Sequence, residues 1–136
     1  MSTYEQLKKK NVLKKKAHNR TPGLENNPQK KGTVKRARIV TPRKPNSARR
    51  PVAKVILSSE KRLTAHIPGV GHNIRSHSSV LIRGGGSRDL PGVRYSCIRG
   101  VYDFSSIADK KRRRSLYGTK KPIEGTKKLR RKFRFN

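Results

Sequence analysis

The sequence predicts a mainly β protein: a small OB-like five-stranded barrel with a long basic N-terminal arm and a basic C-terminal tail. The first observation is charge, since 37 Lys and Arg residues against 7 Asp and Glu give a net charge of +30 in 136 residues. The second is its distribution, which is +14 over residues 1–50, +5 over 51–107 and +11 over 108–136. The third is that 17 of the 29 Leu, Ile, Val and Phe residues lie within 51–107. A folded core in the middle and two basic ends follow.

The apolar residues of the middle segment come in short runs typical of strands. Residues 52–57 are a β-branched run, 63–67 alternate apolar with polar, and 80–82 and 95–101 are further runs between Gly or Pro clusters. Upstream, 33–40 is typical of a basic strand. Four or five short strands with long loops predict a Greek-key or OB-like barrel.

The same patterns divide the chain into three parts. These are a basic N-terminal extension over 1–27, the barrel over 28–107 with long loops at 41–50 and 83–94, and a basic tail over 108–136. Segments 1–16 and 106–117 are each expected to contain a short basic helix.

Several classes of protein are excluded by what the sequence lacks. Cys97 is the only cysteine, so an internal disulfide and a cysteine-based zinc site are not expected. No run approaches the ~18 apolar residues of a membrane span, and residues 1–20 contain no apolar secretory segment. His72 and His77 have no carboxylate or thiolate beside them, so we expect no metal site. Without a GxSxG elbow or a pair of carboxylates, we expect no enzyme and no cofactor.

Blocks of Lys and Arg at 8–10, 14–16, 110–114 and 127–132 predict a polyanionic partner. A solvated charged face, a targeting signal and anionic lipid are alternatives. Nucleic acid is favoured because +30 exceeds what solubility requires and the runs alternate with Gly, Pro and Asn instead of lining an amphipathic helix. RNA is favoured over DNA because aromatic residues are scarce, no helix-turn-helix or heptad pattern occurs, and Gly- and Pro-rich loops suit an irregular RNA surface.

Segment 41–50, which reads TPRKPNSARR, joins two expected strands. Its prolines Pro42 and Pro45 stiffen the loop, so Asn46 and Ser47 would project with little entropy left to lose on binding. An amide and a hydroxyl offer donors and acceptors to a 2′-hydroxyl or a base edge, and the neighbouring cations would hold phosphates. An ordinary Pro/Asn/Ser turn is the alternative.

Segment 83–94, which reads RGGGSRDLPGVR, is the second long loop. Its three glycines permit close backbone approach, but the spacing is not that of a nucleotide-binding P-loop. Asp89 is one of only seven acidic residues and lies between Arg88 and Arg94. An intramolecular ion pair that pins the loop is the alternative to a binding role. His66, on an alternating strand, is expected at the surface or against phosphate.

Short motifs occur in a fixed order along the chain. They read PQKKG at 28–32, TPRKPNSA at 41–48, IPGVGHN at 67–73, LIRGG at 81–85, DLPGVRY at 89–95, RG at 99–100 and YG at 117–118. In order and spacing they resemble the family of small-subunit ribosomal protein twelve, and the resemblance runs from about residue 3 to residue 122.

The resemblance implies an OB-type barrel that is a structural component of the small ribosomal subunit, binds small-subunit rRNA and supports the A-site decoding centre and translational accuracy. Implied partners are small-subunit rRNA, other small-subunit ribosomal proteins and the mRNA–tRNA decoding complex, with elongation factors nearby. The residues expected to contact decoding-centre rRNA are Arg43, Lys44, Pro45, Asn46, Ser47, Arg88, Asp89 and Pro91. Those expected to contact rRNA phosphates are Lys8, Lys9, Lys14, Lys15, Lys16, Arg49, Arg50, Arg112, Arg113 and Arg114. Asp89 is also the candidate for the methylthio modification that bacterial relatives carry at the matching aspartate.

Some positions depart from the family pattern. Arg43 and Arg88 replace lysines and Gly86 replaces an arginine, so a drug response is not carried over. The segment 123–136 extends past the usual end and is expected to bind extra RNA or a lineage-specific neighbour. These departures, with AHIP at 65–68 and CIRGV at 97–101, look more like mitochondrial members. The mitochondrial ribosome is therefore the expected location, with the bacterial cytoplasm or plastid as alternatives.

The alternative function is that of a general RNA chaperone or architectural nucleic-acid-binding protein. Such a protein would need only the basic arms. The pair of loops favours the ribosomal role.

Overall fold

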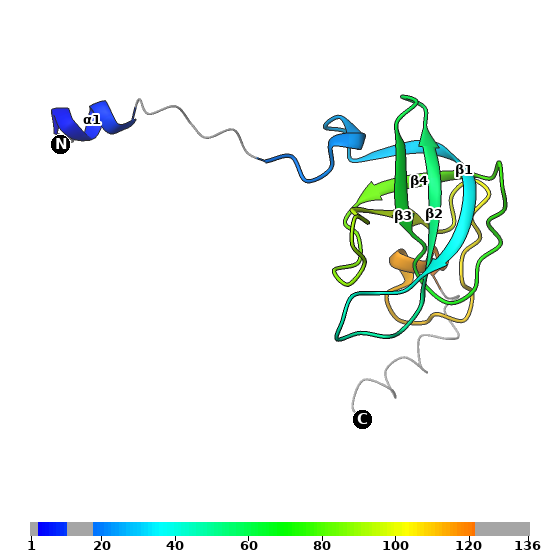
Figure 1. Ribbon diagram of the computed structural model, residues 1–136. Helices are drawn as coiled ribbons and strands as arrows, with labels where there is room; N and C mark the ends of the chain where they lie inside the picture. The colour runs from blue at the N-terminus through cyan, green and yellow to red at the C-terminus, as the bar shows by residue number, and fades with distance from the viewer. Residues whose placement is uncertain (1–2, 11–17, 122–136) are drawn as a thin grey trace.

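A computed structural model describes residues 3–10 and 18–121, and five strands form a closed barrel in it (Figure 1). The strands are β1 (Gln29–Val40), β2 (Arg50–Leu57), β3 (Arg62–His66), β4 (Ser79–Gly84) and β5 (Tyr95–Ile98). Their order is β1-β2-β3-β5-β4, and β4 pairs back with β1. All neighbours are antiparallel except β3 and β5, which run parallel. This is the five-stranded OB arrangement, so the predicted mainly β barrel is confirmed.

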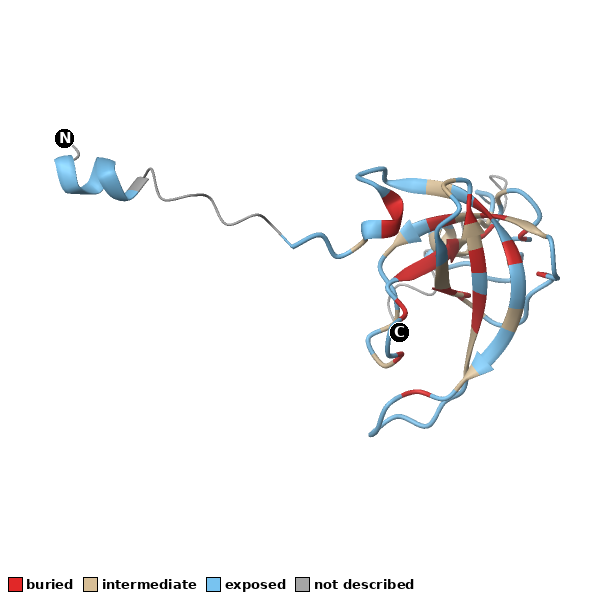
Figure 2. Ribbon diagram, turned by 45° about the horizontal axis from the view of Figure 1, so that its top comes forward, coloured by how far each residue is buried: buried red, intermediate tan, exposed pale blue. Residues whose placement is uncertain are grey.

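The core fills the inside of the barrel because alternate strand residues point inward. Ala53, Val55 and Leu57 of β2 are buried, whereas Lys54 between them is exposed. The largest fully buried side chains include Phe104, Ile67 and Ile82. Figure 2 shows this pattern as alternating buried and exposed bands along the strands. Most of the core thus lies in the segment where the sequence concentrates its apolar residues, and Leu24 and Val34 join it from upstream.

Strand β1 begins four residues earlier than the sequence predicts. Its first part, Gln29–Thr33, pairs with β4, and its second part, from Gly32 on, pairs with β2. The early part was missed because Gln, Lys, Lys and Gly carry no apolar pattern. At Gly32, which pairs with both β2 and β4, an added Cβ would lie 2.6 Å from Val55 Cγ1, so only glycine leaves room for the β2 side chain.

The shortest strand pairing in the barrel is the one between β3 and β5. Only two pairs of residues face each other there, Ala65 with Tyr95 and His66 with Ser96. A 3₁₀ turn, η1 (Pro22–Leu24), packs at this seam. Leu24 belongs to the main core and is 3% exposed, and the Gly23 N–H donates to the Tyr95 hydroxyl at 2.8 Å. Residues 22–24 therefore help to close the barrel.

Helical structure is limited to α1 (Tyr4–Lys10), η1 and η2 (Arg114–Tyr117) within the described residues. Residues 1–2 and 11–16 of the segment 1–16, expected to contain a helix, lie outside them. The helix expected over 106–117 is wrong except for η2. Instead the chain folds back, since the Ile107 N–H donates to the Tyr117 carbonyl at 3.0 Å, and Arg113 has a left-handed backbone. Adjacent cations without an apolar stripe give a longer helix nothing to stabilise it. None of the described helices has the length and apolarity needed to cross a membrane.

Arg99 is 3% exposed and ties the loop after β3 to the barrel. Its Nε donates to the Pro68 carbonyl at 2.5 Å, Nη1 donates to the Ser105 carbonyl at 3.2 Å, and Nη2 donates to the Gly71 carbonyl. The guanidinium also stacks 4.4 Å from the centroid of the Phe104 ring. Backbone carbonyls thus satisfy a buried cation that has no acidic partner among the described residues.

Candidate nucleic-acid interface

Both long loops predicted from the sequence meet at one end of the barrel (Figure 1). The first joins β1 to β2 and the second joins β4 to β5. They are in contact because the Arg43 N–H donates to the Asp89 carbonyl at 2.9 Å. OB folds bind oligonucleotides with these two loops and the face of strands 2 and 3. The loops chosen by residue type are therefore the two that this topology uses for nucleic acid.

The tip of the first loop is a tight, exposed turn. The Asn46 N–H donates to the Arg43 carbonyl at 3.0 Å, and the Lys44–Pro45 peptide bond inside the turn is cis. Residues 43–49 are all exposed, whereas Pro42 at the base is buried. Within the described part of the chain, the side chains of Lys44, Asn46 and Ser47 make no hydrogen bond or ion pair. Their polar groups therefore face outward.

Asp89 joins the two loops through its side chain. One carboxylate oxygen accepts from Arg50 Nε at 2.5 Å and the other accepts from Ser87 Oγ at 2.6 Å. The Asp89 side chain is 10% exposed and that of Arg50 is 36% exposed. The Ser87 hydrogen bond, followed by that from Arg50, lowers the pKa of Asp89 below its usual value. The carboxylate is therefore ionised at neutral pH.

The ion pair considered in the sequence analysis exists, but its partner comes from the other loop. Arg88 and Arg94, which flank Asp89 in sequence, are exposed and form no ion pair in the described structure. Arg50 binds Asp89 within the chain, and its expected contact with phosphate stays a prediction. Asp89 thus faces the protein, while Arg88 and Pro91 beside it face outward.

A small apolar cluster lies at the base of the two loops. It contains Val52 of β2 with Leu90 and Val93 of the second loop, and Val40 packs against it. Gly86 lies where the loop closes on itself, because an added Cβ would be 1.9 Å from the Val93 carbonyl oxygen. The glycine that departs from the family pattern is therefore required by this backbone.

His66 lies beside the Arg50–Asp89 pair and is half-buried, not on the open surface. It pairs across the sheet with Val52. Burial lowers its pKa, Arg50 lowers it further, and Asp89 opposes them. The His66 imidazole is therefore neutral at pH 7 and offers no positive charge to a phosphate.

The other residues predicted to bind RNA are scattered. Lys8 and Lys9 are exposed on α1, Arg49 is exposed in the first loop, and Arg112 and Arg113 are exposed before η2. Arg114 begins η2 and is partly buried. Lys14, Lys15, Lys16 and the segment 123–136 lie outside the described residues.

The motif at 67–73 has a structural explanation in the fold. The Asn73 amide donates to the Asp103 carbonyl at 2.8 Å and its oxygen accepts from the Ser105 N–H at 3.1 Å. His72 and His77 are exposed. The described residues contain no group of three or more His, Cys, Asp or Glu that could hold a metal ion.

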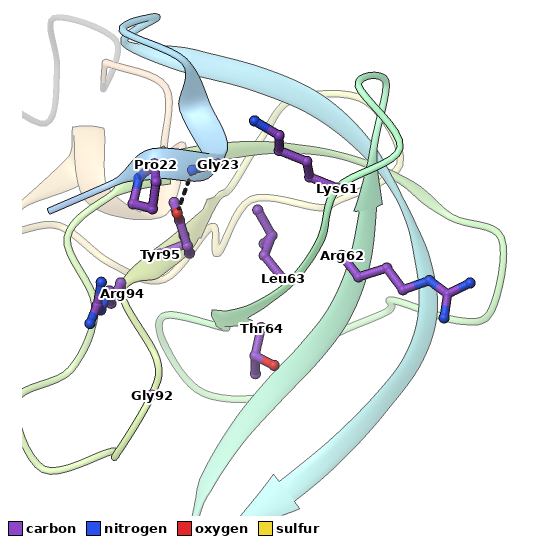
Figure 3. Close-up of a pocket in the computed structure, with 9 residues that line it drawn as sticks. All are labelled: Pro22, Gly23, Lys61, Arg62, Leu63, Thr64, Gly92, Arg94 and Tyr95. Atoms are coloured by element: carbon purple, nitrogen blue, oxygen red, sulfur yellow. Dashed lines mark hydrogen bonds between the residues drawn. The ribbon is translucent and has the colours of Figure 1, made fainter. Parts of the chain in front are cut away.

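A hollow of about 580 Å³ beside the seam was not foreseen from the sequence. Figure 3 shows Pro22, Leu63 and Tyr95 around it, with Arg94 at one side. Lys61 at its upper edge is 2.7 Å from a Glu25 oxygen, and Lys30 binds the other oxygen of the same carboxylate. The hydrogen bonds from these two lysines lower the Glu25 pKa to about 2. No sequence pattern marks this hollow, because its residues come from three separate segments.

Comparison with known proteins defines the class of the chain. The sequence profile of the family "Ribosomal protein S12/S23" matches residues 17–124, and the chain belongs to this family. A relative from Paramecium tetraurelia, "Small ribosomal subunit protein uS12m", is 61% identical over 127 residues, which cover 91% of each chain. The expected resemblance and the expected mitochondrial location are confirmed by these matches. The chain has a structural role in the ribosome.

Proposed function

We propose that the chain binds small-subunit rRNA with the loop end of its barrel and supports the decoding centre there. The observation that carries this proposal is the Asp89–Arg50 pair, which fixes the second loop against the first. The turn at 43–46 thereby projects from a rigid base with its polar groups exposed. Preorganised groups lose less entropy on binding than mobile ones.

The polar groups at the tip suit an irregular RNA surface better than a regular double helix. The Asn46 amide and the Ser47 hydroxyl can donate to and accept from base edges and 2′-hydroxyls. Arg43, Lys44 and Arg49 are exposed beside them and would neutralise the flanking phosphates. Arg88 and Pro91 of the second loop would support the same RNA from one side.

The mechanism we propose makes no covalent bond. The loops hold the rRNA in the geometry in which it closes on a correct codon–anticodon minor groove. A small difference in pairing energy then becomes a larger difference in acceptance, as in other cases of induced fit. The mRNA–tRNA complex and elongation factors would be neighbours of this end, while the basic arms would contact rRNA phosphates and other small-subunit proteins. Asp89 is also the proposed modification site. A modifying enzyme would need access to its side chain, which is 10% exposed.

The test is to substitute Lys44→Ala and Asn46→Ala separately and measure misreading of near-cognate codons together with the yield of small subunits. We expect several-fold changes in misreading with near-normal assembly, because Lys44 and Asn46 are exposed and outside the core of the barrel. Arg75→Ala, an exposed cation outside both loops, is the control. Defective assembly with unchanged fidelity in the surviving particles would contradict the proposal.

A second test separates a ribosomal protein from a general RNA chaperone. RNA crosslinked to the 41–50 peptide in native organelle extract is sequenced. We expect crosslinks confined to the decoding helix of small-subunit rRNA. Crosslinks spread over unrelated RNAs would favour the chaperone.

A further inference from the structure

The outer wall of the barrel carries a second cationic surface, which we call the wall groove. It is a hollow of about 450 Å³ over β1, β2 and β3. The charged residues that line it are Lys35, Arg36, Lys54 and Arg62, and its lining contains no acidic residue. All four side chains are exposed and form no hydrogen bond or ion pair with any described residue. None of them was singled out from the sequence.

Strand register forces these charges together. A bulge in β1 between Val34 and Arg36 leaves Lys35 and Arg36 both exposed, and Arg36 lies directly opposite Lys54 of β2. Like charges directly opposite each other destabilise a sheet. A counter-ion from outside the chain would relieve this repulsion.

The third strand adds to the same surface. Thr64 of β3 lies opposite Lys54, and Arg62 lies opposite Ile56. Figure 3 shows the Arg62 side chain extending away from the hollow at the seam and over the neighbouring strands. The wall groove therefore combines cations from three adjacent strands with a partly exposed apolar residue, Ile56, on its floor.

The contrast with Lys30 and Lys61 shows that the fold can neutralise its lysines. Both of those bind Glu25, whereas no carboxylate reaches the wall groove within the described residues. The cations of the wall groove are thus left available to an external anion.

We infer that the wall groove is a second RNA-binding surface, which holds the sugar–phosphate backbone of an rRNA segment apart from the RNA at the loops. This inference rests on the proposed function, because it takes rRNA as the partner. Fixed cations on a sheet match the repeated charges of a phosphate backbone, and the face of strands 2 and 3 is the one that OB folds offer to oligonucleotides. An acidic protein segment is the competing occupant.

Crosslinking from defined positions distinguishes these occupants. Cys97 is 1% exposed and burial raises its pKa to about 12, so an added surface cysteine would be the only reactive thiol in the chain. A short photoreactive group is attached at Thr64→Cys in the wall groove, or at Ala48→Cys in the first loop, and the full chain is assembled into small subunits. We expect both positions to label rRNA, at different nucleotides.

Two other outcomes would each overturn a proposal. Labelling of rRNA from Ala48→Cys, with only protein or nothing labelled from Thr64→Cys, would overturn the wall groove and leave the proposed function standing. Failure of both positions to label rRNA would overturn both proposals.

Neutralisation provides an independent measurement. In the full chain, the double variant Arg36→Gln/Lys54→Gln should raise the melting temperature by about 2–4 °C, because the facing like charges are removed. It should also weaken binding to small-subunit rRNA about tenfold, because about two phosphate contacts are lost. The control Lys120→Gln/Lys121→Gln removes the same charge from exposed residues that have no partner within the described ranges, and should change binding less than threefold. Equal losses in the two variants would show that only net charge matters and would overturn the inference.

Discussion

Asp89 shows how a single acidic residue organises a cationic surface. It accepts from Arg50 and Ser87 with its carboxylate and from the Arg43 backbone with its carbonyl. Two loops that would otherwise repel each other are thereby held in contact. The residue that stabilises the binding surface is the one that opposes its charge.

We predict that Asp89→Asn loosens the loops without unfolding the barrel. The Arg43 amide should exchange with solvent several-fold faster, because the carbonyl that it binds is no longer anchored by the ion pair. The Gly100 amide, bonded to the Phe104 carbonyl at 2.8 Å, should be unaffected. Hydrogen exchange read by NMR measures both, with Asp109→Asn as an exposed control. Unchanged Arg43 exchange would contradict a role of the side chain in joining the loops.

The same pair gives a pH dependence of defined sign. Because the folded state lowers the Asp89 pKa below 3.8, the stabilisation is fully present above that value and is lost as the pH falls through the folded pKa. In the wild-type chain, exchange at Arg43 should therefore be constant from pH 7 down to about 4, after correction for intrinsic rates, and rise only below it. A rise at a pH between the usual carboxyl and imidazole ranges would instead implicate His66, whose pKa lies below that of an ordinary histidine.

At this scale the sequence predicts which residues are exposed at the loop tips but not which residues they pair with. Proline and glycine placement, with Asn and Ser between, indicates projecting loops. The partner of Asp89 lies 39 residues away, and many arginines are candidates. Only the register of β1, β2 and β4 brings Arg50 into reach.

At the scale of elements, the seam between β3 and β5 depends on a segment far away in sequence. The Gly23 N–H donates to the Tyr95 hydroxyl and so links η1 to β5. Glycine is needed at 23 because an added Cβ would lie 2.9 Å from that hydroxyl oxygen. The turn η1 thus completes the barrel where strand pairing is shortest.

Tyr95→Phe should therefore reduce stability by about 1–3 kcal/mol, because it leaves the buried Gly23 N–H without an acceptor. Urea unfolding of the full chain, together with the exchange rate of the Gly23 amide, measures this. Tyr102→Phe, at a ring that is 56% exposed, is the matched control and should be close to neutral. Equal effects of the two substitutions would contradict the role assigned to the hydroxyl.

Strands with β-branched runs were predictable, and elements without an apolar pattern were not. Residues 52–57, 63–67 and 80–82 each fall almost wholly within an observed strand. The start of β1 and the turn η1 carry too few apolar residues to be seen in advance. The segment 106–117 was misassigned because its ends are held by contacts with each other and not by helical hydrogen bonds.

At the scale of the whole molecule, the charge of +30 governs how strongly the chain responds to salt. If about eight cations neutralise phosphates on single-stranded RNA, log K should fall with log salt at a slope of about −6. Filter binding of the full chain between low and moderate KCl concentration measures this slope. A slope shallower than about −2 would mean that hydrogen bonds, and not phosphate contacts, dominate the affinity.

The closed order of the barrel also determines when the surface becomes complete during synthesis. β5 is the last strand in sequence, yet it lies between β3 and β4 and closes the ring. A nascent chain that ends before Ile98 lacks this strand, and one that ends before Asp89 cannot join the two loops. A truncated or misfolded product would therefore lack the assembled loop end. Only chains made through residue 98 of the 136 therefore contain every strand that the assembled loop end needs.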